Sequence, residues 1–521
     1  MAKQDSFLTA VQQGYTFKGG SFPLGVGMLD GHAVPGALVQ LPLKTMNRHG
    51  LIAGATGTGK TKTLQVLAEG LSDASIPVVL MDIKGDLSGI AAAGSTNARI
   101  EERMQLIGTA FRPAAFPVEL MTLSDSQPGV RLRATVSEFG PILLSKILGL
   151  NDTQQGIVAM IFKFCDDNKM PLLDLKDFIK VIQYISNEGK AELEKDYGKI
   201  ATTSTGTILR KVIELQQQGA DAFFGEPSFE VDDLLRIADD GRGMISILRV
   251  MELQNRPKLF STFMLSLLAE LYATLPEEGD LDQPKLCLFI DEAHLVFQEA
   301  NEALLQQIET VIKLIRSKGV GIFFCTQNPQ DVPASVLSQL GLKVQHALRA
   351  FTAADRKVIK TAAENYPLTE YYKTNELLTQ LGIGEALVTL LSEKGIPTPL
   401  VHTLLLPPRS RMDILSDGEV LDRVQRSRLV KKYATTLDSE SAHEIITAKL
   451  EEAARRTEEA KTTTENARQP ARPAKTEKGF FDNPTVKQVG RTAATIITRS
   501  LLGALGLGGR TTTRRRKSGF F

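Results

Sequence analysis

The sequence predicts an α/β fold with a mostly parallel sheet, a helical insertion, and a partly disordered helical C-terminal tail. Three observations predict it. Short continuous apolar runs, typical of strands buried on both faces, alternate with segments of helical periodicity. Between residues 145 and 237 strand signals are scarce and apolar residues recur at three- and four-residue spacing. Beyond Pro407-Pro408 the chain becomes charged and lacks a broad apolar face.

The first half of the predicted core begins after a short lead-in. Residues 1–45 are rich in Gly and Pro, with an extended stretch at 37–43, and predict a small β-containing segment. A strand at 50–53 then leads into a Gly-rich loop and a helix, and the apolar run 77–83 predicts the next strand. Strand, loop, helix and strand form a βαβ unit, which implies parallel pairing and right-handed crossovers.

The second half of the core follows the insertion. Further strands are predicted at 243–250, 285–290, 320–325, 343–350 and 385–389, with helices over about 257–275 and 301–317. The predicted organisation is a lead-in (1–45), a first core part (46–144), a helical insertion (145–237), a second core part (238–407), a helical extension (408–466) and a flexible basic tail (467–521).

A phosphate-binding motif lies between the first predicted strand and helix. Residues 54–61, Gly-Ala-Thr-Gly-Thr-Gly-Lys-Thr, match G-x-x-x-x-G-K-[ST]. Glycines let backbone N–H groups wrap the β-phosphate, Lys60 neutralises β- and γ-phosphate charge, and Thr61 offers its hydroxyl to Mg²⁺. The predicted cofactors are ATP and Mg²⁺. The predicted cradle comprises Gly54, Ala55, Thr56, Gly57, Thr58, Gly59, Lys60, Thr61 and Thr63.

An acidic pair follows the apolar run 286–290. In a P-loop ATPase, Asp291 would hold Mg²⁺ through its water and Glu292 would polarise the attacking water as general base. The alternative is an acidic pair that caps a following helix. The motif at 54–61 favours the catalytic interpretation.

Two polar residues flank the predicted strand at 320–325. Gln327 can hydrogen-bond both the γ-phosphate and the attacking water, although Asn328-Pro329 also predicts a simple turn. Arg316 ends the preceding helix, where a cation ordinarily compensates the helix dipole. It can alternatively act as an arginine finger on a neighbouring subunit's γ-phosphate. Arg349 is a weaker competitor for that role.

Two further patterns leave alternatives open. Asp82, Lys84 and Asp86 follow the second strand, where an indirect magnesium role and a capped turn around Gly85 explain the triplet equally well. The tetrad at 291–294 also occurs in two-domain monomeric helicases. Those need a second RecA-like domain downstream, and residues 351–440 show no sign of one.

These motifs together resemble the HerA-like branch of the HerA/FtsK superfamily, and within it a bacterial HerA-like subgroup of unknown function. The resemblance covers about residues 15–407 and rests on the helical insertion and on four motifs, at 48–61, 81–86, 289–294 and 326–329. It implies a RecA-like P-loop core that assembles as a hexameric ring. In such a ring ATP is held between subunits, and its hydrolysis drives DNA or protein translocation.

The resemblance also assigns residue roles. The family's nucleotide-site roles are assigned directly to Lys60, Thr61, Asp291, Glu292 and Gln327. Arg316 matches the family's arginine that acts on the neighbouring subunit. HerA proper has a longer N-terminal β-barrel than the lead-in 1–45 can form.

The net charge and the tail sequence limit the kinds of partner that the chain is expected to bind. The net charge of +1 gives no global basic field, so any DNA binding must come from local patches. The tail offers an amphipathic segment at 486–507 and an Arg cluster, which could bind a protein groove or an anionic membrane or simply be a disordered solubilising tail. The leading functional hypothesis is therefore a DNA translocase, and the alternative is a regulatory or assembly ATPase acting on a protein partner or at the membrane surface.

The cysteines and the lengths of the apolar runs predict the cellular compartment of the protein. Cys165, Cys287 and Cys325 are far apart, which predicts reduced core cysteines rather than a disulfide or zinc framework. No signal-peptide-like segment and no apolar run of about 18 residues is present, which predicts a cytoplasmic protein without a transmembrane segment.

Overall fold

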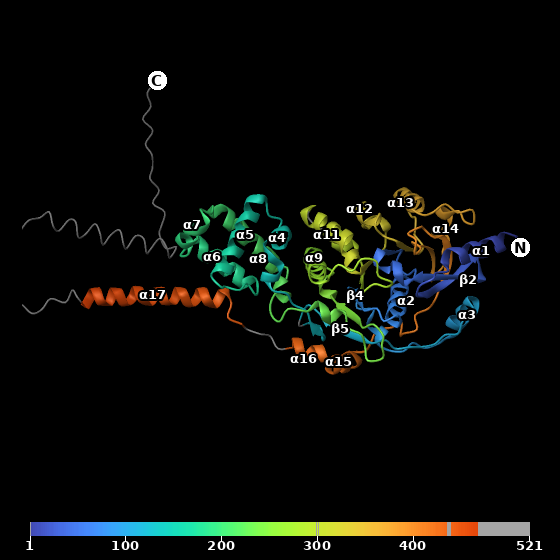
Figure 1. The fold of residues 1–521 in the computed structure, drawn as a ribbon, viewed down its shortest axis with the longest axis horizontal. Helices are drawn as coiled ribbons and strands as arrows, with labels where there is room; N and C mark the ends of the chain where they lie inside the picture. Colours follow the sequence, from blue (N-terminus) through green and yellow to red (C-terminus); the bar gives the residue numbers. More distant parts are fainter. Residues whose placement is uncertain (1, 125, 299, 301, 435–438, 467–521) are drawn as a thin grey trace, which may run out of the picture. The chain divides into compact units, whose positions relative to one another are not determined.

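The computed structural model in Figure 1 describes residues 2–124, 126–298, 300, 302–434 and 439–466. The chain forms two compact units, residues 1–450 and 451–521. The first unit contains the sheet and every predicted site residue. In the second unit the described residues, 451–466, belong to a helix. The predicted tail at 467–521, with its amphipathic segment and Arg cluster, lies outside the described residues.

One twelve-stranded sheet organises the described part of the first unit, in the order β2-β1-β12-β11-β10-β3-β9-β8-β4-β7-β5-β6. The strands from β10 to β6 run parallel, whereas β11, β12, β1 and β2 extend the sheet as an antiparallel edge. This confirms the predicted α/β fold. The strands are β1 (Ser21–Leu29), β2 (His32–Pro42), β3 (Gly50–Ala53), β4 (Val78–Asp82), β5 (Val118–Thr122), β6 (Val130–Arg131), β7 (Ile245–Arg249), β8 (Leu286–Ile290), β9 (Val320–Thr326), β10 (Leu342–Gln345), β11 (Glu385–Thr389) and β12 (Val401–Leu405).

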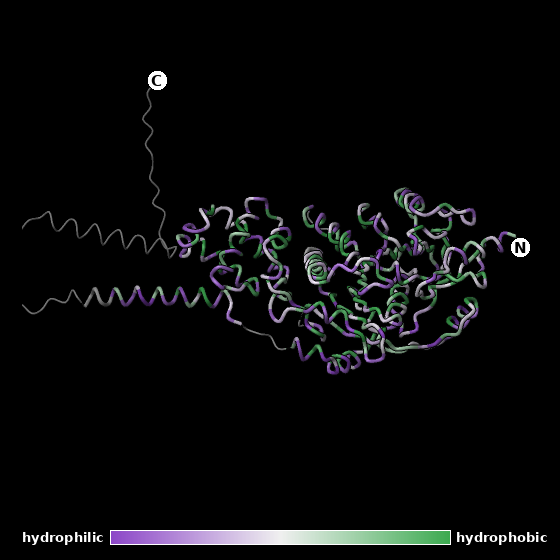
Figure 2. The backbone as a smooth tube through the Cα atoms, in the orientation of Figure 1, coloured by the Kyte–Doolittle hydropathy of each residue, from purple (hydrophilic) through white to green (hydrophobic). Residues whose placement is uncertain are grey.

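Helices cover both faces of this sheet, because its central strands are apolar on both sides. In β4, Val79 and Met81 pack into one hydrophobic cluster, and Val78 and Leu80 into another. The central strands accordingly run mainly through hydrophobic residues (Figure 2). The helices are α1 (Ala2–Tyr15), α2 (Lys60–Asp73), α3 (Ala98–Ile107), α4 (Val136–Ile147), α5 (Asp152–Asp167), α6 (Leu175–Ser186), α7 (Lys190–Tyr197), α8 (Thr202–Gln217), α9 (Pro257–Thr274), α10 (His294–Phe297), α11 (Glu302–Ile315), α12 (Ala334–Leu337), α13 (Ala353–Glu364), α14 (Thr374–Gln380), α15 (Asp417–Arg426), α16 (Arg428–Tyr433) and α17 (Ala442–Asn466).

The lead-in contributes to the main sheet. β1 pairs with β2 on one side and with β12 on the other, so that Gly25 lies opposite Leu405. The helix α1 packs on β2. The sequence pattern indicated only the second half of β2 and gave no sign of α1 or β1.

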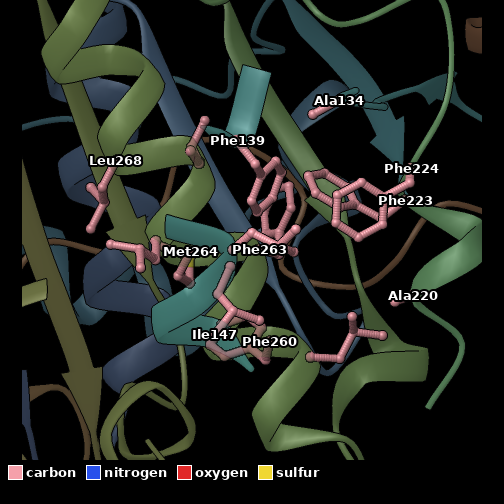
Figure 3. Packing of buried hydrophobic residues seen from close by; sticks show 14 of the residues in the cluster. Ala134, Phe139, Ile147, Ala220, Phe223, Phe224, Phe260, Phe263, Met264 and Leu268 are labelled. Atoms are coloured by element: carbon pink, nitrogen blue, oxygen red, sulfur yellow. The ribbon is translucent and has the colours of Figure 1, made fainter. Parts of the chain in front are cut away.

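Helices α4 to α8 lie together (Figure 1). Helices α5 to α8 fall within residues 145–237, the predicted helical insertion, whereas α4 begins earlier, at Val136. Capping boxes start α4, α5 and α6. An aromatic cluster joins this region to α9: the ring centroid of Phe223 lies 5.7 Å from that of Phe139 and 5.3 Å from that of Phe263 (Figure 3). The insertion is therefore continuous with the core and shares its packing.

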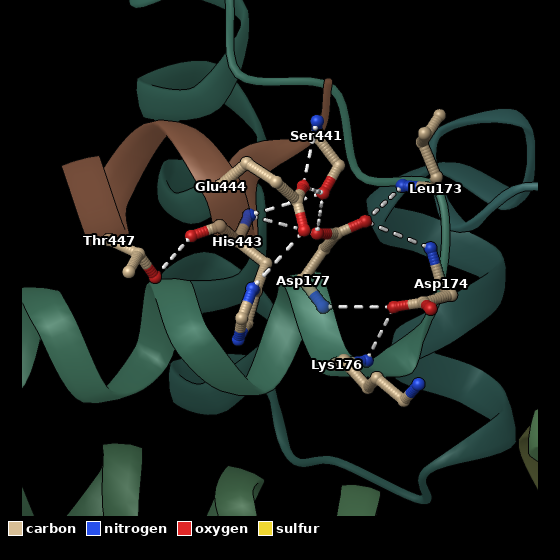
Figure 4. Close-up of polar contacts among 8 residues, drawn as sticks. All are labelled: Leu173, Asp174, Lys176, Asp177, Ser441, His443, Glu444 and Thr447. Carbon is tan, nitrogen blue, oxygen red and sulfur yellow. Dashed lines mark hydrogen bonds and ion pairs between the residues drawn. The ribbon is translucent and has the colours of Figure 1, made fainter. Parts of the chain in front are cut away.

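The start of α17 is fixed to α6 by one buried carboxylate (Figure 4). Asp177 Oδ1 accepts hydrogen bonds from the Ser441 hydroxyl at 2.5 Å and the His443 N–H at 2.9 Å. Its Oδ2 accepts from the N–H groups of Leu173 and Asp174. Residue 177 thus joins the helical insertion to the chain's C-terminal extension.

Two further predictions concern cysteines and membranes. All three cysteines are buried and free, as the sequence predicts. Among the residues the structure describes, no helix combines the length and apolar character that crossing a membrane requires.

Candidate nucleotide-binding site

Four adjacent parallel strands, β3, β9, β8 and β4, end at the same edge of the sheet. The loops that follow them carry the Gly-rich motif, Gln327, the Asp291-Glu292 pair and the Asp82–Asp86 turn. Because the carboxyl edge of an open parallel sheet is where such folds bind ligands, these loops define one candidate site.

The Gly-rich loop is held by its neighbours. The N–H of Gly54 donates to Thr326 O at 3.2 Å, and that of Ala55 donates to Ala347 O at 2.8 Å. Gly57 (φ 77°) and Gly59 (φ 113°) adopt left-handed backbone that other residues rarely take. The loop ends where α2 begins at Lys60, so that the N-terminus of this helix faces the loop.

The Lys60 side chain lies over this loop. Its Nζ donates to Ala55 O at 3.1 Å, and burial lowers its pKa, with Asp291 and Glu292 acting in the opposite direction. Thr61 is half-buried. The Thr63 hydroxyl lies 2.9 Å from His346 Nε2 and its N–H donates to Gly59 O, so Thr63 supports the loop through its own neighbours.

The acidic pair lies at the end of β8 and is almost fully buried. The Lys84 ammonium group contacts Glu292 Oε1 and lies 3.8 Å from Asp291 Oδ2. His294 Nδ1 lies 3.1 Å from the other Glu292 oxygen. Burial raises the pKa of Asp291, and Lys84 opposes that shift. Glu292 also has a left-handed backbone (φ 47°), a costly conformation for a residue with a side chain.

Asp82 forms the capped turn around Gly85, one of the two roles that the sequence left open for it. Its carboxylate accepts backbone N–H groups from Gly85 at 2.7 Å, Asp86 at 3.1 Å and Leu87 at 3.2 Å. Burial, assisted by the nearby Asp86, raises the pKa of Asp82 to about 6. The turn presents Lys84 to the acidic pair, a contact that the sequence did not indicate.

Gln327 faces the Gly-rich loop from the neighbouring strand. Its Oε1 accepts a hydrogen bond from the Thr56 hydroxyl at 3.3 Å. The Asn-Pro turn predicted as an alternative is also present, as a capping box between Asn328 and Asp331. The side chains of 294, 297, 298, 327, 328 and 331 line a cleft of about 640 Å³ at this point.

Arg316 lies apart from these groups. It follows α11 and precedes β9, at the amino edge of the sheet, whereas the Gly-rich loop lies at the carboxyl edge. Sequence reasoning missed Arg48, which lies nearby: burial lowers its pKa, and the positive charge of Arg316 lowers it further. Arg349 is exposed after β10, close in sequence to Ala347, which bonds the loop.

The donor set fits a magnesium–nucleotide complex. Asp291 Oδ2 is a buried oxygen without a hydrogen-bond partner, next to a loop of backbone N–H groups. Within the described residues no group of three or more His, Cys, Asp and Glu side chains could hold a metal ion. Mg²⁺ at phosphate sites needs only one or two protein ligands, because phosphates and waters complete its shell.

Comparison with known proteins now gives the family. The sequence model of the helicase HerA-like C-terminal family matches residues 29–512. The chain belongs to this family. Membership confirms the HerA-like resemblance and, with the fold, identifies the chain as a P-loop ATPase. No curated protein sequence matches the chain.

Three solved structures to which the chain is similar can be compared, and the one with a TM-score above 0.5 shows the same fold. The plasmid coupling protein TrwB in complex with the ATP analogue ADPNP is 13% identical, with a TM-score of 0.51 over 78% of this chain and 95% of that chain. TrwB with ADP and Mg²⁺ is 14% identical, with a TM-score of 0.48 over 76% and 97%. VirB4 of Thermoanaerobacter pseudethanolicus is 16% identical, with a TM-score of 0.45 over 78% and 100%.

Proposed function

We propose that this HerA-like chain hydrolyses Mg²⁺-bound ATP as a ring, a homo-hexamer by family analogy, and couples hydrolysis to translocation on DNA. The observation that carries the ATPase proposal is the convergence of the Gly-rich loop, Asp291-Glu292 and Gln327 on one edge of four adjacent strands. A nucleotide-complexed relative, TrwB, has the same fold and supports the same ligand class.

Each residue then has a role set by its chemistry. The loop N–H groups and Lys60 bind the β- and γ-phosphates, and Thr61 and Asp291 would hold the Mg²⁺, which supplies charge neutralisation at the phosphates. Glu292 acts as general base toward the attacking water, and Gln327 orients that water and senses the γ-phosphate.

The position of Arg316 supports a ring. An arginine at the amino edge of the sheet faces away from its own Gly-rich loop, so it can reach a γ-phosphate only in a neighbouring subunit. Such a group typically contributes 10³–10⁵-fold to turnover. Arg48 lies beside it, and two adjacent guanidinium groups favour an anion between subunits.

A basic face on α13 supports DNA as the substrate. Arg356, Lys357 and Lys360 are exposed on this helix and form no salt bridge with a described residue. Phe351 just before the helix is 87% exposed and offers a stacking surface. Asp355, the acidic residue in the first turn of the helix, is engaged by the N–H groups of Phe351 and Thr352.

This basic face is connected to the nucleotide site from two directions. α13 packs against the short helical turn Pro329–Asp331, which follows Gln327. The segment that leads to α13 contains Ala347, whose carbonyl accepts the N–H of Ala55 in the Gly-rich loop. A change at the γ-phosphate therefore has a short route to the cations that would contact DNA phosphates.

ATP hydrolysis with and without single- and double-stranded DNA tests the proposal. We expect several-fold stimulation of the wild type by DNA and loss of turnover in Glu292→Gln. A triple alanine variant of Arg356, Lys357 and Lys360 should keep basal turnover, lose stimulation, and reduce the salt dependence of DNA binding by about three phosphate contacts. The matched control replaces three exposed lysines of the helical region, Lys169, Lys176 and Lys199, by alanine.

Robust ATP hydrolysis whose rate does not change with any nucleic acid would contradict the proposed translocation on DNA. It would leave the proposed ATPase activity standing. The alternative function, a regulatory or assembly ATPase acting on a protein partner or at the membrane surface, would then be preferred. The segment expected to contact that partner lies outside the described residues.

A further inference from the structure

A cavity of about 230 Å³ opens beside the C-terminal half of α2, away from the Gly-rich loop. Its walls come from the start of β1, from α2, from the end of α3 with the loop 109–112, and from residues 406–409. On α2 the lining begins at Val66, more than one helical turn beyond Lys60. None of the residues assigned to phosphate or magnesium chemistry lines this cavity, so the proposed ATPase activity does not explain it.

The cavity lies where two hydrophobic clusters meet. Phe22 and Val66 belong to the large cluster that contains the buried face of α2. Met104 belongs to a smaller cluster that joins α3 to β1 and β12, and Phe111 packs against that smaller cluster. Leu406 packs against both clusters. The space between them is therefore walled by apolar side chains from two directions.

Close packing and hydrogen bonds fix the frame around this space. A Cβ added to Gly70 would lie 2.3 Å from Phe22 Cδ2, so α2 and β1 already touch and cannot move together to fill it. The N–H of Arg409 donates to Glu69 at 2.9 Å, and Arg409 O accepts the N–H of Ala114 at 3.0 Å. Because these contacts hold the walls in place, a ligand that fills the space causes little reorganisation.

The charged side chains of the lining leave one cation free to bind a ligand. Arg409 contacts the carboxylate of Asp73, and Glu69 accepts the N–H groups of Arg409 and Ser410. Arg112 is exposed at the cavity and forms no hydrogen bond or salt bridge with a described residue. A guanidinium group in this position favours an anion, above all a carboxylate that it can bind through two parallel hydrogen bonds.

The size and the apolar walls limit the rest of the ligand. An apolar cavity of about 150 Å³ is enough to hold benzene. The volume of about 230 Å³ therefore has room for one ring with a short substituent. Phe22 and Phe111 line the cavity, and aromatic side chains pair favourably with another ring in edge-to-face or offset arrangements.

We propose that this cavity binds a small monoanion that carries one aromatic ring. The ring lies against Phe22, Val66 and Phe111, and the anionic group accepts hydrogen bonds from Arg112. This inference does not rest on the proposed function, because the lining residues are separate from those assigned to the nucleotide. It gives the chain a second ligand that is smaller than a nucleotide and contacts the later turns of α2.

A fluorine NMR titration of para-fluorophenylpropionate into the full chain tests the proposal, because this probe carries one ring and one carboxylate. We expect saturable binding with a Kd below about 1 mM. The primary amide of the same probe should bind about tenfold more weakly, because it cannot form a charge-assisted hydrogen bond with Arg112. Saturating ADP with Mg²⁺ should leave the probe bound, because the two sites are separate.

Two substitutions at exposed positions locate the probe. Arg112→Gln should weaken para-fluorophenylpropionate about tenfold and leave the amide unchanged, because only the charged contact is lost. Ala110→Trp should abolish binding of both probes, since Ala110 lines the cavity and an indole ring fills it. The matched control is Arg99→Gln, which should bind both probes like the wild type. Arg99 is also exposed on α3 without a salt bridge to a described residue, but it lies outside the cavity.

Each contrary outcome overturns the proposal. Binding that does not saturate in the millimolar range would do so, as would equal affinities for the anion and its amide. If Arg112→Gln weakens neither probe, or weakens both equally, the arginine does not hold the anionic group. Displacement of the probe by ADP, or unchanged binding in Ala110→Trp, would place the probe outside this cavity. The proposed ATPase activity is tested separately by hydrolysis and stands or falls without these results.

Discussion

The ammonium group of Lys84 contacts the carboxylate of Glu292, the residue proposed as general base. The same ammonium lies 3.8 Å from Asp291. The Lys84 ammonium group occupies a Glu292 oxygen that a water molecule would need, so Glu292 has to exchange this partner before it can activate water. Burial alone would lower the pKa of Lys84, but Asp291 and Glu292 raise it overall, which keeps the cation charged in this position.

Replacing Lys84 by methionine should destabilise the nucleotide-free protein. Two nearly buried carboxylates would then lie side by side without the ammonium group that contacts them. The expected loss of unfolding free energy is only about 1–3 kcal/mol, because Lys84 itself is partly exposed to solvent. Urea unfolding measures this difference. The control is Lys3→Met, which removes an exposed pair with Asp30 and should change stability by less than about 1 kcal/mol. Equal effects of both substitutions would contradict the ion-pair interpretation.

Mixing two inactive variants should restore hydrolysis if Arg316 acts between subunits. Arg316→Ala removes the finger and leaves the subunit's own site complete, whereas Glu292→Gln does the opposite. In mixed rings some interfaces combine an intact site with an intact arginine. We expect turnover to rise from background to a maximum at intermediate mixing ratios. Mixtures that stay at background at every ratio would show that Arg316 serves its own subunit or has only a structural role.

Stability should depend on pH through His49. This buried side chain accepts the N–H of Ile322 on Nδ1 at 3.0 Å and lies 2.9 Å from Ile312 O through Nε2, which requires the neutral ring. Burial lowers its pKa to about 4, so the unfolded chain binds the proton first as pH falls below 6.5. The stabilisation from His49 is thus complete above pH 6.5 and is lost as pH falls toward 4.

The measurement compares wild type with His49→Gln by denaturant unfolding at several pH values. The difference in unfolding free energy between them should be largest above pH 6.5 and should shrink toward pH 4. A difference that stays constant with pH would show that the ring does not change protonation on folding. His346 offers a parallel case, since burial also lowers its pKa to about 4.

Alanine substitutions at Gly54 and Gly57 of the Gly-rich loop should lower the stability of the protein by different amounts. A Cβ at Gly54 would lie 2.5 Å from His346 Cβ, so Gly54→Ala must displace the strand segment that holds the loop. Gly57 has open space around it and a φ of 77°, so Gly57→Ala meets only the backbone penalty of about 1 kcal/mol. Thermal unfolding should show a clearly larger loss for Gly54→Ala. The reverse order would contradict the packing described around His346.

Asp177→Ala should release the start of α17 from the helical region. The substitution removes the carboxylate that joins the Ser441 hydroxyl and the His443 N–H to the N–H groups of Leu173 and Asp174, at an expected cost in unfolding free energy of about 2–4 kcal/mol because the carboxylate is fully buried. Amide hydrogen exchange should increase in residues 442–450. The control is Lys449→Ala, which breaks an exposed pair with Glu192 and should leave that exchange nearly unchanged.

The sequence predicted the parts of the fold and site that local pattern determines. The Gly-rich loop, the strand before it and the acidic pair after β8 each occupy a few consecutive residues whose types follow from one chemical need. The apolar runs of β4, β7, β8 and β9 were recognisable because strands buried on both faces need no alternation. Because neighbouring parallel strands end at the same edge of a sheet, the prediction of a parallel sheet was enough to place the loops after these strands at one edge.

What the sequence could not show depends on contacts between distant segments. Lys84 and Glu292 meet only because β4 and β8 are neighbours, and no spacing in the chain encodes that adjacency. Strand β6 has only two residues, too few to form a pattern. Helix α1 buries just Phe7, Val11 and Tyr15, about one apolar side chain per turn, and so narrow an apolar stripe does not stand out from the polar residues around it.

The pairing of β1 with β12 has a consequence for the order in which the molecule forms. Gly25 cannot find its partner until Leu405 has left the ribosome. During synthesis the first hairpin must therefore wait, with one strand edge unpaired, while the ATPase strands emerge and assemble behind it. Closure of the antiparallel edge is then a late folding event of high contact order, and newly made chains are most exposed to edge-to-edge aggregation just before it.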